Sequence, residues 1–330
     1  MAADPPDEAV AGHYGDPYRE QRLLLSGRGA VDLSHRPVLR ISGPDRLPWL
    51  HSLLSQHVAD LRPGESREAL VLSPHGHVEH HLHLVETGED VLAHVEPGTA
   101  EALVAFLDSM RFLLRVEVAV DPSLAVVWTP PLASSPPSAA EGATVRTSEA
   151  VTSTGFGSYH LVPAEAVDRM RVEPAGLLAH EALRVAALRP RLGLDTDHRT
   201  LPHEVGWLAS AVHLDKGCYR GQETVARVHN LGRPPRRLVL LHLDGSDSEL
   251  PAVGSPVLLG EREAGRLGTV ARHAELGPIA LALVKRTVPD DAALVVGGVA
   301  ASVDSAAVVV EPDSQAREAA AARANLMRFR

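Results

Sequence analysis

The 330-residue chain has little cysteine and no excess of basic charge. Its one cysteine excludes an intramolecular disulfide and any metal site built from cysteines alone, and it fits a reducing compartment. Lysine and arginine number 32 against 42 aspartates and glutamates, which gives a formal charge of −10. Because proteins that bind nucleic acid normally carry a basic surface, the sequence predicts no nucleic-acid partner.

Long apolar runs are also absent. The longest, residues 279–284 and 306–310, fall far short of the roughly 20 residues that a membrane helix needs. Residues 1–12 are acidic and contain Pro5 and Pro6, without the basic start and apolar centre of a secretory signal. We therefore expect a cytoplasmic protein with no membrane partner.

Composition and periodicity divide the chain into segments. Residues 1–18 carry charge, proline and glycine without an apolar period, and we expect them to be disordered. Residues 19–128 alternate strand and helix patterns in the order β-α-β-β-α-β, which is typical of split βαβ units; the first strands are left open to pairing with the next unit. Residues 129–144 are rich in Pro, Ser and Ala and predict a linker or loop. Residues 145–236 form a second mixed unit.

The last part of the chain has a different pattern. Residues 237–311 hold six short apolar stretches between Gly, Pro and Asp turns, which predicts a small antiparallel β-barrel. The sixth strand is expected at residues 307–310, and residues 312–330 are expected to form a C-terminal helix or tail. The predicted fold class is therefore α+β, with two mixed units followed by a barrel.

The most informative segment surrounds the only cysteine, Cys218. Gly217 and Gly221 bracket it, so we expect the thiol on a tight turn. A helical pattern from Gln222 onward places a helix N-terminus nearby, and Lys216 adds positive potential. Both features lower the pKa of a thiol and favour a working thiolate. A buried and inert cysteine is the alternative that residue chemistry alone leaves open.

Residues 216–223 read KGCYRGQE, which resembles the K-G-C-Y-x-G-Q-E signature of the YgfZ-type folate-binding proteins, relatives of the glycine-cleavage T-protein, the aminomethyltransferase. Residues 31–35 (VDLSH) resemble the start of the T-protein family, and residues 200–204 (TLPHE) resemble its approach to the signature. The resemblance covers about residues 20–311. It implies a monomeric three-lobed cloverleaf, in which two α+β units and a β-barrel surround a central hole that receives tetrahydrofolate.

The resemblance also implies a role in the assembly or repair of iron–sulfur clusters, with client or assembly proteins as partners. Cys218 is then the functional thiol, assisted by Lys216. The residues expected to bind the folate are Tyr219, Gln222, Glu223, Arg227, His80 and Glu204. Among them, Arg227 is the candidate for the anionic tail of the ligand.

Two positions depart from the family pattern. Where T-proteins have G-G-x-x-D-D-L, residues 76–82 read GHVEHHL, so His80 and His81 replace both aspartates. A histidine is mostly neutral at pH 7 and does not supply a fixed negative charge, so we expect no aminomethyltransferase activity. Ala186 replaces the glutamate of an L-R-x-E-A-G helix that serves the pterin ring, and Glu204 and Asp197 are the candidates to take its place.

Histidines also alternate along this stretch and share one face of a strand. The residues of that face are His75, His77, Glu79, His81 and His83. Two neighbours on one strand supply only part of a closed metal site, so we expect no metal and favour a solvated or cavity-lining face. His80 lies on the opposite face and is expected to point into a pocket. Two alternatives to the accessory role stay open: a folate-dependent one-carbon transferase, and a non-catalytic scaffold with a relict cavity.

Overall fold

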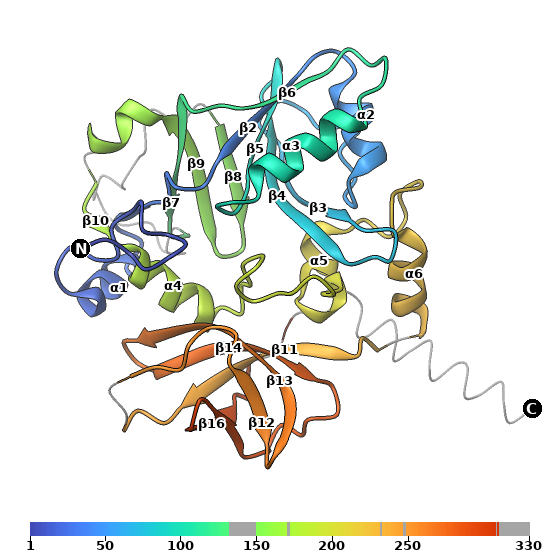
Figure 1. Ribbon diagram of the computed structural model, residues 1–330. Helices are drawn as coiled ribbons and strands as arrows, with labels where there is room; N and C mark the ends of the chain where they lie inside the picture. The colour runs from blue at the N-terminus through green and yellow to red at the C-terminus, as the bar shows by residue number, and fades with distance from the viewer. Residues whose placement is uncertain (132–149, 170–171, 232, 247–248, 308, 310–330) are drawn as a thin grey trace, which may run out of the picture.

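The computed structural model describes residues 1–131, 150–169, 172–231, 233–246, 249–307 and 309. Two five-stranded sheets stand side by side above a closed barrel, and α4 (Leu177–Ala186) lies between the barrel and the sheet that contains β7 and β9 (Figure 1). The α+β fold with a C-terminal barrel is therefore confirmed. Nearly all of the predicted linker, from residue 132, and the predicted C-terminal helix or tail lie outside the described residues.

The first lobe has strand order β3-β4-β5-β2-β6. Its strands are β2 (Val38–Ser42), β3 (Ser66–Leu72), β4 (Val78–Glu86), β5 (Asp90–His94) and β6 (Glu117–Val120). The helices α2 (Arg46–Leu53) and α3 (Ala100–Ser109) share one apolar core with this sheet, and Leu82 and Leu84 of β4 belong to that core. Because side chains alternate along a strand, His81 and His83 take the opposite face of β4.

The second sheet has strand order β10-β1-β7-β9-β8. Its strands are β1 (Ala30–Asp32), β7 (Leu124–Thr129), β8 (Ala150–Thr154), β9 (Gly157–Pro163) and β10 (Pro174–Ala175). A short 3₁₀ helix, η1 (Ala164–Arg169), follows β9. β1 joins this sheet, which is the pairing left open for the first strands of residues 19–128, and β7, at the end of that segment, joins it as well. Successive residues of β7 are buried, so both faces of this strand are covered, as expected for the middle of a sheet.

The N-terminal segment is ordered, and the predicted disorder over residues 1–18 is wrong. Ala2 and Ala11 form an antiparallel bridge, and α1 (Pro17–Leu25) begins after Asp16, whose carboxylate accepts hydrogen bonds from two main-chain N–H groups of the first turn. Asp7 is buried in an ion pair with Arg191. A composition window shows the charge of Asp7 but not this distant partner, which explains the error.

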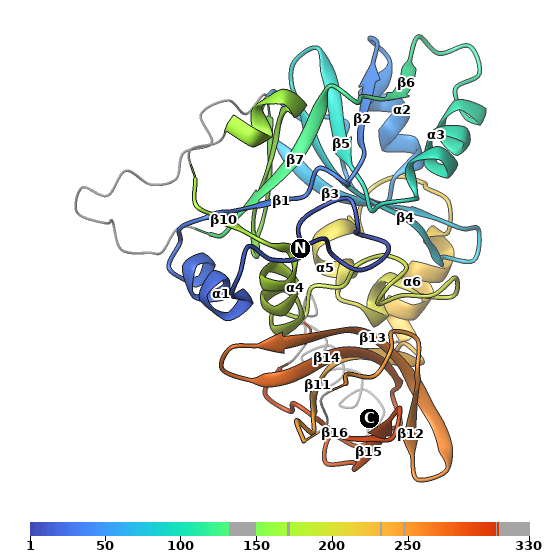
Figure 2. The same cartoon turned by 60° about the vertical axis from the view of Figure 1, so that its left-hand side comes forward.

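Six antiparallel strands close the barrel, as the sequence predicted (Figure 2). They are β11 (Arg236–Leu243), β12 (Pro256–Leu259), β13 (Arg262–His273), β14 (Gly277–Lys285), β15 (Leu294–Val296) and β16 (Val299–Val303). The sixth strand of the barrel is β16; the strand expected at residues 307–310 includes positions 308 and 310, which lie outside the described residues. Gly297 and Gly298 have φ values of 57° and 88°, which a two-residue hairpin turn requires, so the chain turns back directly after β15.

The remaining helices connect the second sheet to the barrel. They are the 3₁₀ helix η2 (Pro202–Glu204), α5 (Trp207–Ala211) and α6 (Gln222–Leu231). The loop from α5 to α6 carries Cys218, and α6 begins where the sequence predicted. Within the described ranges, no helix is both long enough and apolar enough to cross a membrane.

The two glycines beside Cys218 differ in structural role. Gly221 has a φ of 82°, and a Cβ atom there would lie 2.5 Å from the carbonyl oxygen of Ser73. Gly217 is not among the glycines with positive φ, and a Cβ there would have no neighbour within 4 Å. Gly221 therefore fixes the loop against the turn between β3 and β4, whereas Gly217 does not.

We predict that Gly221→Ala lowers the free energy of unfolding by about 1–3 kcal/mol, because alanine is strained at positive φ and its methyl group meets backbone. Gly217→Ala is the matched control and should change it by less than about 0.5 kcal/mol. Urea unfolding measures both values. Equal effects for the two variants would contradict this account of the loop.

Candidate functional site

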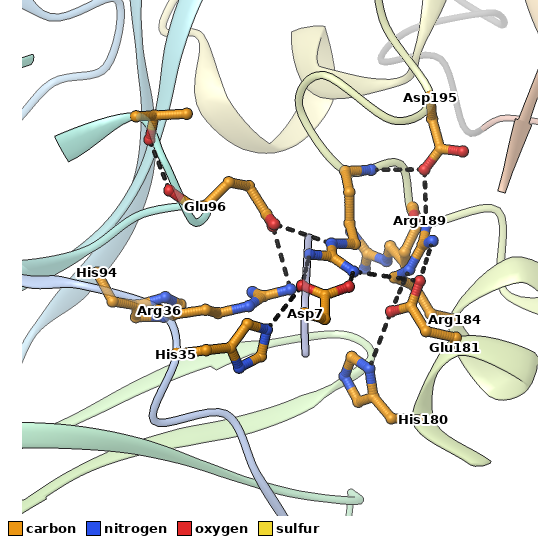
Figure 3. A network of polar contacts seen from close by, with 12 residues as sticks. Asp7, His35, Arg36, His94, Glu96, His180, Glu181, Arg184, Arg189 and Asp195 are labelled. Carbon is orange, nitrogen blue, oxygen red and sulfur yellow. Dashed lines mark hydrogen bonds and ion pairs between the residues drawn. The ribbon is translucent and has the colours of Figure 1, made fainter. Parts of the chain in front are cut away.

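A network of buried ion pairs lies where the lobes meet (Figure 3). Arg184 of α4 donates to both carboxylate oxygens of Glu181 at 3.0 and 2.5 Å and to Asp195 at 2.8 Å. It also donates to the hydroxyl of Thr269 on β13 at 2.6 Å, and Asp195 accepts from the main-chain N–H of Thr269 at 2.6 Å. These contacts attach α4 to the barrel.

A second buried arginine, Arg191, extends the network to the other lobes. Its guanidinium makes a bidentate pair with Asp7, at 2.8 Å for both bonds, and donates to Glu96 at 2.8 Å. Glu96 follows β5 and also pairs with Arg36 at 3.1 Å, while His35 lies 2.9 Å from Asp7. Burial opposes ionisation of Asp7, but its contacts with Arg191 and His35 outweigh it and hold the pKa of the carboxyl below its usual range.

The inner face of β4 presents histidines to this centre. His83 stacks on His94 with ring centroids 4.6 Å apart and an interplanar angle of 2°, and both rings contact Tyr159. His81 lies 4.5 Å from the ring of Trp207. A solvated face is therefore wrong for His81 and His83, whereas the cavity-lining alternative holds. Across the described residues, no group of three or more His, Cys, Asp or Glu side chains has the arrangement of a metal site.

Glu68 places a carboxylate beside His81, one of the two histidines that stand where T-proteins have aspartates. It lies on β3 opposite His83, and its Oε2 accepts from Ser210 at 2.8 Å and lies 3.4 Å from Nε2 of His81. Burial opposes ionisation, but the contacts with His81 and Ser210 outweigh it and hold the pKa of Glu68 well below its usual range. The centre thus contains a fixed negative charge that comes from the neighbouring strand.

The cavity at the centre is small. It is lined by Glu68, His81, His83, Tyr159 and the arginines of the network, and its volume is about 30 Å³, enough for about two water molecules. The expected hole for tetrahydrofolate is therefore filled by ion pairs in this conformation, and a folate does not fit in the central cavity alone.

Two larger cavities adjoin the central one. The lateral cavity, about 480 Å³, lies between α1, the end of α4 and the β8–β9 turn, and it shares Phe156 and Arg189 with the central cavity. The barrel-side cavity, about 530 Å³, lies between the end of α4 and α5 and shares Arg189 and Trp207 with it. Ala186, the position of the missing family glutamate, lines both larger cavities. A fourth cavity of about 530 Å³ lies between the N-terminal segment and the barrel.

Arg189 is thus the side chain at which three cavities meet. It follows Leu188, whose φ of 52° is unusual for a residue with a side chain and ends α4 in a left-handed turn. Arg189 N–H then donates to the carbonyl of Arg184 at 3.0 Å. A left-handed leucine costs roughly 1–2 kcal/mol, so the fold carries local strain where it presents this arginine.

The loop with Cys218 lies outside these cavities. The thiol is exposed, as a working thiol requires. Lys216 is buried and donates to the carbonyl oxygens of His51, Leu54 and Gln56, and burial lowers its pKa to about 8. Its ammonium group is therefore committed to the end of α2 and the residues just after it rather than to the thiol, which corrects the expected role of Lys216 beside Cys218.

The predicted folate-binding residues of this loop serve its structure or face solvent. Tyr219 is buried, and burial raises its pKa to about 12; Gln222 donates to the carbonyl of Lys216 at 3.3 Å. Glu223 and Arg227 are exposed on α6. For the described part of the chain, none of the four cavities is lined by Cys218, Tyr219, Gln222, Glu223 or Arg227.

The other residues predicted to bind the folate also lie away from the cavities. Both oxygens of Glu204 accept from Arg236, at 2.9 and 2.8 Å, and Asp197 accepts from the same guanidinium at 2.6 Å. Neither carboxylate is available to replace the glutamate lost at Ala186. His80 is buried on the face of β4 opposite His81 and lines none of the four cavities in the described chain.

Sequence reasoning missed the residues that build the centre. They are Arg36, Glu68, Glu96, Glu181, Arg184, Arg189 and Arg191. A usable signal was present in one place, because Arg184 and Glu181 are three residues apart on a strongly apolar helix, where charged residues need partners. Glu68 lies on β3 and Glu96 follows β5, and no local pattern joins them to α4.

Comparison with known proteins agrees with this architecture. Residues 236–310 match the family model described as CAF17, C-terminal beta-barrel domain, so the chain has a barrel of this type. Aminomethyltransferases of Chromobacterium violaceum and Stenotrophomonas maltophilia are 28% and 30% identical to the chain, over 59% and 62% of its length. A putative chloroplastic transferase of Arabidopsis thaliana is 24% identical over 73% of the chain.

The chain spans 61%, 64% and 61% of the lengths of these three relatives, which is less than two thirds in each case. The solved structure of glycine cleavage system aminomethyltransferase T from Bartonella henselae superposes with a TM-score of 0.72, covering 91% of this chain and 94% of that one at 19% identity. The fold is therefore that of an aminomethyltransferase, with homologues among these enzymes.

The buried histidines generate a prediction about pH. Burial lowers the pKa of His80 to about 4 and of His83 to about 3, whereas both titrate near 6.5 in an unfolded chain. At a pH between the folded and the unfolded pKa, the unfolded state binds more protons than the folded state. The free energy of unfolding should therefore decrease as pH falls from 7 to 5, by at most about 1.4 kcal/mol per pH unit for each histidine.

Urea unfolding across this pH range measures the slope, and carboxylates, whose ordinary pKa values lie below pH 5, begin to contribute only near its lower end. His80→Gln should make the slope shallower, and the exposed His75→Gln is the matched control that should leave it unchanged. A slope that is the same in all three proteins would contradict the assignment of His80 as a neutral buried group.

Proposed function

We propose that the protein binds a reduced folate in the cavities that meet at Arg189, and that it supports iron–sulfur cluster assembly or repair through Cys218. The observation that carries the folate half is the convergence of three cavities at Arg189, in a fold shared with an aminomethyltransferase. The sequence resemblance of residues 216–223 supports the iron–sulfur half.

Volume supports the placement of the ligand. Pockets for ligands of this size occupy roughly 300–1,000 Å³, so the central cavity is too small by itself. The lateral and barrel-side cavities, about 480 and 530 Å³, supply the room. The folate therefore lies across the central cavity and at least one neighbour, with side chains of the centre moving apart to admit it.

Glu68 is the residue that replaces the missing family glutamate in this proposal. A pterin ring presents amino and ring N–H donors, and a carboxylate offers two acceptor oxygens. Oε1 of Glu68 has no hydrogen-bond partner within the described chain, and the side chain lines the central cavity. Its ionised state makes it the stronger acceptor.

Cys218 acts on a different surface from the folate. The thiol is exposed on a loop that Gly221 and Lys216 hold in place, so a macromolecule can reach it without entering the cavities. We assign it to contact with iron–sulfur client or assembly proteins. Folate binding and the thiol are then two separable features of the same protein.

A folate-dependent one-carbon transferase is the second candidate, and Glu68 is the observation that favours it. His80 and His81 stand where T-proteins have two aspartates, but Glu68, on β3, places a negative charge beside His81. Turnover of an aminomethylated carrier protein with tetrahydrofolate separates this candidate from the accessory role. A relict scaffold is distinguished from both by the failure to bind any folate.

Titration calorimetry with tetrahydrofolate tests the folate half. Wild type should bind, and Glu68→Gln should weaken binding about 10–100-fold, because a hydrogen bond to a charged group contributes about 1.5–3 kcal/mol. Glu65→Gln is the control, since Glu65 precedes β3 and lies outside the central cavity. No binding by wild type at millimolar tetrahydrofolate would refute the proposal.

Complementation tests the thiol. Cys218→Ser should leave melting temperature and tetrahydrofolate affinity unchanged, because the side chain is exposed and lines none of the described cavities. It should nonetheless reduce the activity of iron–sulfur enzymes in cells that lack the wild-type gene. Full complementation by Cys218→Ser at equal protein level would remove the thiol from the function.

A further inference from the structure

The lateral cavity has an aromatic wall. The ring of Phe156 stacks on that of Trp128, with centroids 4.9 Å apart and an interplanar angle of 27°. Leu24 of α1 and Leu183 of α4 add apolar surface to the same cavity. Trp128 is only 1% exposed, so the half-buried ring of Phe156, supported by Trp128, is the surface suited to stacking with a planar ring.

The polar groups of this cavity are hydrogen-bond donors. Arg189 is half-buried, and in the described chain no hydrogen bond or ion pair engages its guanidinium. Nδ1 of His273 accepts from the main-chain N–H groups of Glu275 and Leu276 at 3.2 and 3.1 Å, so the proton of the neutral ring is on Nε2. Burial lowers the pKa of His273, which keeps the ring neutral.

Nε1 of Trp128 is buried against Gly157 and has no hydrogen-bond partner in the described chain, so the donors that this cavity offers are those of Arg189 and His273. No carboxylate lines this cavity among the described residues. A cavity with an unpaired guanidinium, N–H donors and no acceptor carboxylate favours an anion, and a guanidinium matches a carboxylate with two parallel hydrogen bonds.

We infer that the lateral cavity binds a planar aromatic carboxylate, with the ring against Phe156 and the carboxylate on Arg189. Within the proposed function, on which this extension rests, the occupant is the p-aminobenzoylglutamate half of the folate. The shared residues Phe156 and Arg189 make the cavity continuous with the centre, where Glu68 receives the pterin. Arg189 thereby takes the role in binding the anionic tail that the sequence suggested for Arg227.

Fragments of folate that lack the pterin ring test the assignment of the lateral cavity. p-Aminobenzoylglutamate and p-aminobenzoate should bind the full-length protein and quench tryptophan fluorescence, and Trp128→Phe should remove most of the quenching. p-Aminobenzamide, which has the same ring without the charge, should bind at least 10-fold more weakly than p-aminobenzoate. This comparison uses wild type alone, so it stands even where a variant fails to fold.

Arg189→Gln should weaken p-aminobenzoylglutamate at least 10-fold, and Arg189→Lys should restore part of the loss. Arg227→Gln is the matched control and should bind as wild type does, because Arg227 is exposed on α6 and lines none of the described cavities. Equal affinity for acid and amide, equal effects of the two glutamine variants, or no binding at millimolar fragment would overturn the inference.

The two proposals fail in different ways. Tetrahydrofolate binding that is insensitive to Arg189→Gln would reject the lateral cavity and leave the proposed function in place. If the fragment binds in an Arg189-dependent way but tetrahydrofolate binds no more tightly than the fragment, the aromatic-carboxylate cavity is supported and the folate site is rejected.

Discussion

The arrangement of the lobes depends on two buried arginines. Arg184 and Arg191 carry charges out of water, and removing one partner from such a buried pair typically costs about 3–5 kcal/mol. Their partners come from the N-terminal segment, the end of β5, α4 itself and the loop before α5. Satisfying both guanidinium groups therefore requires these segments to converge.

The same requirement determines the chemistry of the centre. Because the arginines and carboxylates fill the hole between the lobes, little open volume remains there, and the larger spaces lie beside it. Arg189 differs from Arg184 and Arg191 in having no carboxylate partner within the described chain. In the proposed function, Arg189 is the arginine that binds the ligand, at the point where the cavities meet.

Much of the fold could be predicted from the sequence because its signals are local. The first five barrel strands and the helix after Gly221 follow from apolar periods and turn residues within a few positions, whereas the predicted β-α-β-β-α-β order has one strand too few between α2 and α3. The sequence left the pairing of β1 with the second sheet open and could not decide it, because its partners β7 and β10 are distant in the chain. The order of the N-terminal segment depends on Asp7 meeting Arg191, a contact across 184 positions.

In the candidate site, too, the features set by local sequence could be predicted, whereas those set by distant contacts could not. The exposure of Cys218 was predictable from its turn, but the committed ammonium of Lys216 was not, since the carbonyl oxygens that bind it belong to residues 51–56. The sequence offers Glu204 as a replacement for the missing family glutamate, but in the structure Arg236, on the first barrel strand, donates to its carboxylate. A motif identifies the loop, whereas the cavities are built by side chains that meet only after folding.

A crystal structure of the protein with saturating tetrahydrofolate tests the central claim most directly. The account predicts electron density that begins beside Glu68 and continues past Arg189 into the lateral cavity, with the side chains of the central cavity displaced. Unchanged ion pairs and no ligand density in any of the cavities that meet at Arg189, in a protein shown to be correctly folded, would contradict it.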